Sequence, residues 1–139
     1  MLLFERLSPG VTIEIETNGT IAAVDALRRR VSQWNVSPKL SNSGDPLHLR
    51  VRHKILEEFR DTDRAWLKLV VATSEDLAEA DQLVGSLEWP RQRALLMAEA
   101  SDRRTLAARM PWVIDAARAR GWGVSPRLHI ERFDGARGV

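Results

Sequence analysis

The 139-residue sequence contains no cysteine and no tyrosine, and it has no long run of apolar residues. Without cysteine, the chain's own side chains cannot form a disulfide, a thiolate zinc site or a protein-ligated iron–sulfur cluster. No run approaches the ~18 apolar residues that a membrane-spanning helix needs. The first residues also lack the basic and apolar regions of a secretory signal. The sequence therefore predicts a cytoplasmic protein that has no contact with a membrane.

Lysine is scarce as well, and this scarcity explains a sequence pI of about 9.6 that would otherwise suggest a nucleic-acid-binding protein. The formal net charge is only +2. Because the chain has three lysines and no Tyr or Cys, few groups titrate between neutral pH and the lysine range, and the pI is high for that reason. Arginine runs at residues 28–30 and 103–104 have acidic neighbours and are interpreted as solvated faces. Nucleic-acid binding is the least favoured function.

The pattern of apolar residues predicts strands and helices in alternation. Strands are expected at residues 11–16, 31–36, 65–72 and 93–97, with a last extended piece at 122–130. The strand at 65–72 is nearly continuous in apolar residues, which is typical of a parallel strand covered on both faces. With 44% hydrophobic residues, residues 1–139 are expected to form one domain. The predicted fold class is α/β with a mostly parallel sheet.

Helices are expected between these strands. Apolar residues recur at helical spacing over residues 47–60, which predicts one amphipathic helix there. Thr73 or Ser74 can begin a second helix as its N-cap. Pro111 lies inside a third, longer helical segment and predicts a kink or a break just before it.

Three polar motifs follow predicted strands, at residues 16–20 (ETNGT), 37–44 (SPKLSNSG) and 125–129 (SPRLH). Open α/β sheets and α/β barrels bind ligands at the carboxyl ends of their strands, so the motifs mark a candidate binding edge. From the residues alone, Glu16 is either a partly buried carboxylate that needs a partner or a structural turn acid. His129 is either a site residue or a hydrogen-bonded histidine of the sheet. Both pairs of alternatives stay open at this point.

The same motifs, in this order, resemble 7-carboxy-7-deazaguanine synthase, a radical S-adenosylmethionine enzyme. Residues 11–20 look like the third barrel strand of that family, and residues 36–44 are similar to the fourth. The resemblance covers nearly the whole chain. It continues through the lysine-containing fifth strand, the sixth strand, the closing PRLH segment and the tail, at residues 66–71, 95–99, 125–130 and 133–139.

This resemblance implies a fold and an activity. Members of the family fold as a partial (β/α)6 barrel, so the chain is expected to be the C-terminal two-thirds of a truncated radical S-adenosylmethionine barrel. They are carbon–nitrogen lyases that convert 6-carboxy-5,6,7,8-tetrahydropterin to 7-carboxy-7-deazaguanine, towards queuosine and other deazapurines. The implied cofactors are S-adenosylmethionine, an iron–sulfur cluster and magnesium.

The resemblance also implies roles for individual residues. Pterin binding is implied for two residues at a strand end and two near the end of the chain, which are Glu16, Asn18, His129 and the terminal carboxylate of Val139. A carboxylate at the strand end can accept hydrogen bonds from the ring N–H and amino groups of a pterin. S-adenosylmethionine binding is implied for Ser37 and Lys39.

The chain departs from the family pattern where the cluster would be held. The family's N-terminal third, with its Cys-x3-Cys-x2-Cys loop, is absent, so no residue of this chain is expected to ligate the cluster or a metal. The leading hypothesis is a C-terminal part that needs a cysteine-bearing partner polypeptide for activity. An unpaired sheet edge and an apolar face predict a homo-oligomer, such as a dimer, or a hetero-oligomer. The alternative hypothesis is a non-catalytic pterin- or nucleotide-binding or interaction module derived from the family.

Overall fold

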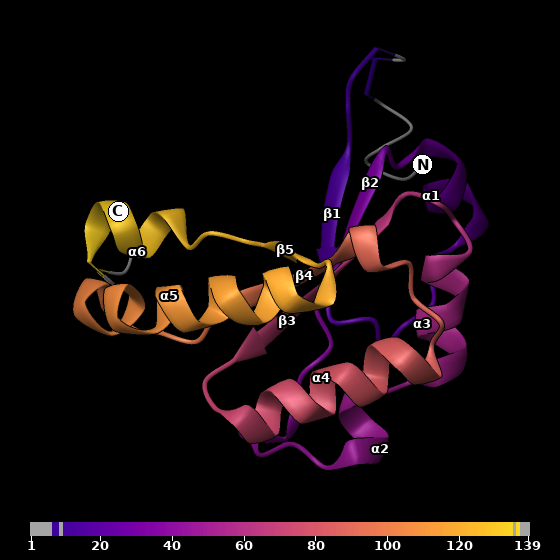
Figure 1. Cartoon of the computed structure of the whole chain (residues 1–139). Coiled ribbons are helices and arrows are strands. Elements are labelled where there is room, and N and C mark those ends of the chain that lie inside the picture. The colour runs from indigo at the N-terminus through magenta and orange to yellow at the C-terminus, as the bar shows by residue number, and fades with distance from the viewer. Residues whose placement is uncertain (1–6, 9, 135, 137–139) are drawn as a thin grey trace.

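Five parallel strands form one sheet in the computed structural model, which describes residues 7–8, 10–134 and 136 (Figure 1). Strands that neighbour each other in space also follow each other in sequence, and every pairing is parallel. The sheet does not close, because β1 and β5 are its two edges. The expected α/β class is confirmed, and the open parallel sheet agrees with a partial barrel. The strands are β1 (Glu14–Thr17), β2 (Gln33–Val36), β3 (Ala65–Val71), β4 (Ala94–Ala98) and β5 (Gly123–Val124).

Helices connect successive strands. Because every crossover steps to the next strand in the same direction and such connections are right-handed, the crossover helices cover one face of the sheet. They are α1 (Asp25–Arg30), α2 (Leu47–Arg50), α3 (His53–Arg60), α4 (Ser74–Ser86) and α5 (Arg103–Arg120), with α6 (Leu128–Phe133) after β5 and short 3-10 turns η2 (Ser41–Ser43) and η3 (Arg91–Arg93).

The two faces of the sheet differ in burial. Along β3, Leu67 and Leu69 are fully buried on the helical side, whereas Trp66, Lys68 and Val70 alternate with them and are half-buried on the other side. The expectation that this strand is covered on both faces is therefore wrong. An apolar face was also expected. The open face is instead mixed, because carboxylate, amide and ammonium groups stand among its apolar side chains.

The helix boundaries confirm one expectation and correct two. Thr73 caps α4, since its hydroxyl accepts from Asp76 N at 3.3 Å while the Asp76 carboxylate accepts from Thr73 N at 3.0 Å. The expected helix over residues 47–60 is divided in two, because Val51 has an extended backbone between α2 and α3. The expected break at Pro111 is absent, and α5 runs uninterrupted with its buried side chains packed against β4.

One continuous cluster of buried apolar side chains lies between the sheet and its helices. All five tryptophans are buried or half-buried, which agrees with their interpretation as core residues. Trp34 meets Phe59 edge to face, with ring centroids 5.0 Å apart. No helix in the described part of the chain is both long and apolar enough to cross a membrane.

Candidate ligand-binding site

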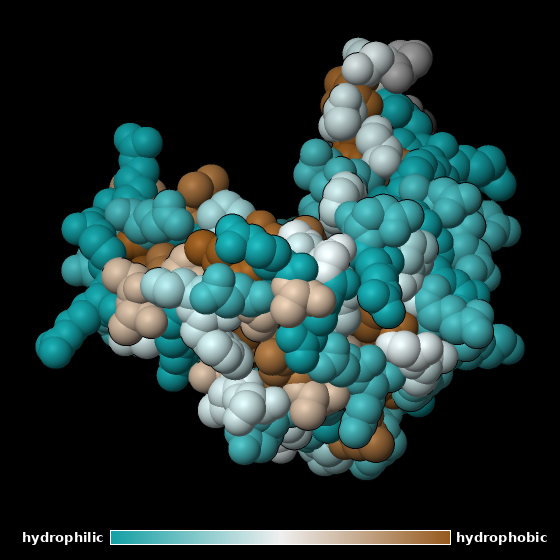
Figure 2. Space-filling view, in the orientation of Figure 1, coloured by the Kyte–Doolittle hydropathy of each residue, from teal (hydrophilic) through white to brown (hydrophobic). Residues whose placement is uncertain are grey.

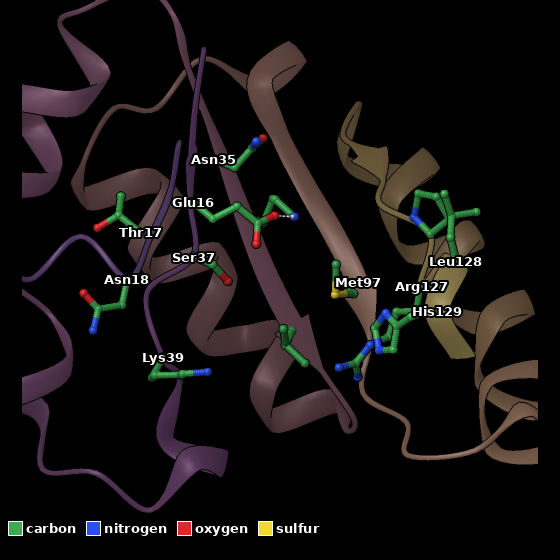
Figure 3. A pocket seen from close by; sticks show the side chains of 13 residues that line it. Glu16, Thr17, Asn18, Asn35, Ser37, Lys39, Met97, Arg127, Leu128 and His129 are labelled. Carbon is green, nitrogen blue, oxygen red and sulfur yellow. Dashed lines mark hydrogen bonds and ion pairs between the residues drawn. The ribbon is translucent and has the colours of Figure 1, made fainter. Parts of the chain in front are cut away.

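A cavity of about 610 Å³ lies at the carboxyl ends of the strands, on the open face of the sheet. Figure 2 shows a hollow between the part of the molecule that carries α6 and the part that carries β1 and β2. Figure 3 shows the side chains from these opposite walls around the same space. The lining residues are Glu16, Thr17, Asn18, Asn35, Ser37, Lys39, Lys68, Val70, Met97, Pro126, Arg127, Leu128 and His129.

The first wall begins at the end of β1, where the chain turns sharply. Asn18 Oδ1 accepts hydrogen bonds from Thr20 N at 3.1 Å and from Thr20 Oγ1 at 2.7 Å, so its carbonyl oxygen is used within the turn. Gly19 has φ of +71°, and a Cβ there would lie 2.4 Å from Leu56 Cδ2. Only glycine combines this backbone conformation with such a close approach, so Gly19 fixes the turn that ends β1.

Glu16 is bound by a lysine from the middle of the sheet. Lys68 Nζ donates to Glu16 Oε1 at 2.9 Å (Figure 3). The Lys68 side chain is only 16% exposed, whereas that of Glu16 is 76% exposed. The two residues stand on β3 and β1, so the ammonium group reaches across β2 beside Asn35. The pair links β1 to β3 across β2 on the open face of the sheet.

The loop after β2 carries Ser37 and Lys39, and it is held against the sheet and α4. Ser37 N donates to Thr17 O at 2.7 Å, which extends the β1–β2 pairing into the loop. Asn42 Nδ2 donates to Val70 O at 3.1 Å, and Ser41 N donates to Glu79 Oε2 at 2.8 Å. These contacts fix the backbone on which the Lys39 side chain stands.

A largely buried ion pair supports the same loop. Arg50 Nη1 donates to Glu79 Oε1 and also to Lys39 O at 3.2 Å, and the Arg50 side chain is 8% exposed. Burial by itself would raise the pKa of Glu79. Hydrogen bonds from Ser41 N, Ser41 Oγ and Arg50 outweigh that effect and lower the pKa below its ordinary value. The Glu79 carboxylate is therefore ionised at neutral pH.

The second wall consists of the connection from β5 into α6. Arg127 Nη1 donates to Ala100 O at 2.9 Å and fastens this connection to the end of β4. His129 follows on α6 and is exposed. The expectation of an extended piece over residues 122–130 is wrong, because the strand ends at Val124 and the chain then turns into a helix that buries Ile130.

The charges around the cavity favour an anionic ligand that also carries hydrogen-bond donors. Lys39, Lys68 and Arg127 contribute three cations, and Glu16 contributes one carboxylate. Lys68 is paired with that carboxylate, which leaves the cations on both walls to attract a carboxylate or phosphate group. The second oxygen of Glu16 is available to accept from an N–H group.

The structure brings five of the six residues singled out from the sequence to this cavity, which are Glu16, Asn18, Ser37, Lys39 and His129. Val139 lies outside the described residues. Sequence reasoning assigned no role to Asn35, Lys68 and Met97, nor to Arg127 of the SPRLH motif, and all four line the same cavity. Two signals pointed to Lys68, which are a charged residue inside an otherwise apolar strand and the resemblance of residues 66–71 to a lysine-containing strand of the family.

The residues present fit some of the implied cofactors and not others. A chain without cysteine cannot supply thiolate ligands to an iron–sulfur cluster. Over the described ranges, no three His, Asp or Glu side chains gather in a way that could hold a metal ion. A hydroxyl at Ser37 and an ammonium at Lys39 do suit the ribose and carboxylate groups of S-adenosylmethionine.

The first arginine run is engaged within the protein. Arg28 pairs with Glu58 and donates to Ala23 O at 2.8 Å, while Arg30 donates to Ser8 O at 2.6 Å and to Val11 O at 3.1 Å. These guanidinium groups hold loops in place around α1. Only Arg29 of this run is exposed, so the run is not the fully solvated face that was expected, and two of its three guanidinium groups are used within the protein.

Three curated proteins called 7-carboxy-7-deazaguanine synthase are similar to the chain. That of Pyrobaculum aerophilum is 36% identical over 129 residues, which are 91% of this chain and 54% of the relative. Those of Hyperthermus butylicus and Rhodopirellula baltica are 28% and 27% identical, over 88% and 99% of this chain and 54% and 57% of the relatives. The chain thus spans about half the length of the curated relatives it matches. No protein-family model matches it.

Proposed function

We propose that this chain, which is 36% identical to a curated 7-carboxy-7-deazaguanine synthase over 91% of its length, is the substrate-holding C-terminal part of such a synthase. The complete enzyme would convert 6-carboxy-5,6,7,8-tetrahydropterin to 7-carboxy-7-deazaguanine in the cytoplasm. Residues 1–139 would form one domain that contributes the carboxyl-end cavity, while a second polypeptide would contribute the cysteine ligands of the cluster.

One observation carries the proposal. Glu16, Ser37 and His129 are separated by more than a hundred residues of sequence in total, yet they line one cavity together with Asn18 and Lys39. This cavity lies at the carboxyl ends of parallel strands, which is where α/β barrels bind their substrates. Its excess of cations suits a substrate and a cofactor that each carry a carboxylate.

The roles of the side chains follow from their chemistry. Glu16 would accept hydrogen bonds from the ring N–H and amino groups of the pterin. Asn18, His129 and the Val139 carboxylate would contact the same ligand. Ser37 and Lys39 would bind the ribose and the carboxylate of S-adenosylmethionine. When bound, S-adenosylmethionine would supply the radical chemistry, and this chain would orient both ligands.

Within the described part of the chain no strand pairs with the outer edge of β1, and this supports the need for a partner polypeptide. Gln33 N donates to Ile13 O and Ser37 N donates to Thr17 O, so residues 13, 15 and 17 direct their backbone groups to β2. The groups of Glu14 and Glu16 between them face the edge. Exposed apolar side chains also precede and follow β1 in the sequence, at Leu7, Val11, Ile21 and Val24.

A second candidate function uses the same cavity without catalysis. The chain would then be a pterin- or nucleotide-binding or interaction module that retained the pocket. The absence of cysteine from the sequence favours this reading over independent catalysis. Tight pterin binding by the isolated chain, with no turnover when a cysteine-bearing partner is supplied, would support it.

Two experiments test the proposal. Calorimetry should show that the purified chain binds 6-carboxytetrahydropterin and S-adenosylmethionine with 1:1 stoichiometry. Anaerobic purification of the tagged chain from its native cells, followed by mass spectrometry, should yield a stoichiometric partner with a Cys-x3-Cys-x2-Cys segment, and the pair should form 7-carboxy-7-deazaguanine. A chain that binds neither ligand would refute the proposal, and a pair that binds without turnover would favour the second function.

A further inference from the structure

We propose that Lys68 is a positioning residue for the proposed pterin site, holding the Glu16 carboxylate in the orientation that accepts the pterin. The proposal rests on the proposed function of the cavity. Neither the resemblance nor the similarity to known synthases gives Lys68 a role. Its evidence is the contact between Lys68 Nζ and Glu16 Oε1 at 2.9 Å.

The position of Glu16 explains why its carboxylate needs to be held. Glu16 stands on the edge strand β1, and its side chain is 76% exposed. A glutamate in this setting can adopt several rotamers, and fixing one of them on ligand binding lowers the affinity. A carboxylate that is already oriented avoids that loss.

Lys68 is suited to fix the carboxylate because it is itself constrained. Its side chain is 16% exposed, and it extends from the middle of β3 between Trp66 and Val70. Most of the Lys68 side chain is therefore shielded from solvent where it meets Glu16. Lys68 contacts Oε1 of a residue that lines the cavity, and among the described residues no hydrogen bond engages Oε2, which can therefore accept from a ligand N–H group.

Glu16 can bind Lys68 and still accept hydrogen bonds from a pterin. An ionised carboxylate offers about four lone-pair sites. One is taken by Lys68, so the remaining sites can accept from both the ring N–H and the exocyclic amino group. Lys68 also balances the charge of Glu16, which lets the cavity keep its other cations for the carboxylate on the ligand.

The test is a double-mutant cycle on binding of 6-carboxytetrahydropterin, measured by calorimetry under anaerobic conditions. We expect Glu16→Gln to weaken binding about 10- to 100-fold, since it weakens hydrogen bonds to a charged acceptor. Lys68→Met should weaken binding about 3- to 10-fold, and the double variant should bind like Glu16→Gln alone. Lys68→Arg should restore most of the affinity, because a guanidinium group can also reach the carboxylate.

Lys39→Met is the matched control. It removes the same charge from the same cavity without a contact to Glu16, so its effect should add to that of Glu16→Gln. Thermal midpoints of the variants should stay within about 2 °C of the unaltered chain, which excludes a loss of fold.

The binding data distinguish failure of the positioning role from failure of the proposed function. Losses for Lys68→Met and Glu16→Gln that simply add, or an arginine that restores nothing, would overturn the positioning role while leaving the proposed function intact. If the unaltered chain does not bind the pterin at all, both the proposed function and the role of Lys68 are refuted.

Discussion

The guanidinium group of Arg50 is buried against the carboxylate of Glu79, and this contact joins the loop after β2 to α4. Arg50 also donates to the carbonyl oxygens of Lys39 and Asp45, each at 3.2 Å. The pair therefore links the packing of a crossover helix to the backbone of a candidate ligand-binding residue. It has no role in the implied chemistry, yet the shape of one wall of the cavity depends on it.

Glu79→Gln should destabilise the protein by about 3 kcal/mol, because breaking a buried ion pair leaves Arg50 without its counter-charge. Denaturant unfolding, followed by tryptophan fluorescence, measures the change. Replacing both partners, as in Arg50→Met with Glu79→Leu, should cost clearly less, since no uncompensated charge remains. If the single variant is as stable as the unaltered chain, the pair does not hold the loop.

The same pair predicts how stability changes in acid. The pKa of Glu79 is lowered in the folded state, so the unfolded chain binds a proton more readily. The contribution of Glu79 is therefore fully present above the unfolded value of about 4.3 and is lost as pH falls through the lower folded pKa. Unfolding free energies measured between about pH 3 and 6 should fall less steeply for Glu79→Gln. Parallel curves for the two proteins would contradict this.

Gly19→Ala should be far more harmful than Gly44→Ala, although both glycines have positive φ. A Cβ at Gly44 meets nothing within 4 Å, so that variant should lose only about 1 kcal/mol of stability to backbone strain. A Cβ at Gly19 would lie 2.4 Å from Leu56 and 2.9 Å from Val36, which adds about 1–3 kcal/mol of overpacking. Unfolding experiments on the two variants separate strain from steric conflict, and equal losses would contradict the tight turn.

Much of this fold could be predicted from local sequence, because its signals are local. The apolar strands, the Thr73 cap and the polar motifs at strand ends each depend on a few adjacent residues. Since the carboxyl ends of parallel strands meet at one edge, these motifs also predicted that Glu16, Ser37 and His129 come together.

The missed features depend on contacts between distant segments. Lys68 lies in an apolar strand, and only the sheet topology shows that its side chain faces the cavity and Glu16. The division between α2 and α3 leaves the apolar spacing intact, so periodicity could not locate it. His129 was assigned to an extended piece because one buried residue, Ile130, fits a strand or a helix equally.

Substitutions on the two walls of the cavity should weaken the binding of different ligands. Lys39→Met should weaken binding of S-adenosylmethionine about 10-fold, because it removes a charge-assisted hydrogen bond, and should change pterin affinity much less. His129→Ala should have the opposite pattern, since it lies on the α6 wall. Calorimetric titration of each variant with each ligand gives four values, and variants that affect both ligands alike would refute this division of the site.

Association through the edge of β1 can be tested with one pair of proline variants. Glu14 directs its N–H to the free edge, so Glu14→Pro should leave the isolated chain within about 1 kcal/mol of its original stability. The same change should prevent another strand from pairing there. Ile15→Pro is the matched control, because it removes an N–H that bonds to β2 and should cost about 3 kcal/mol.

A defined partner for this test is the part of the Pyrobaculum aerophilum synthase that lies outside the matched 129 residues. Analytical ultracentrifugation should show that it binds the unaltered chain and binds the Glu14→Pro variant at least 10-fold more weakly. Self-association of the unaltered chain, also abolished by Glu14→Pro, would assign the edge to a homodimer instead. A partner that binds both chains equally well would show that assembly uses a different surface, because a proline at Glu14 removes an N–H donor from the start of the outward-facing ladder of β1.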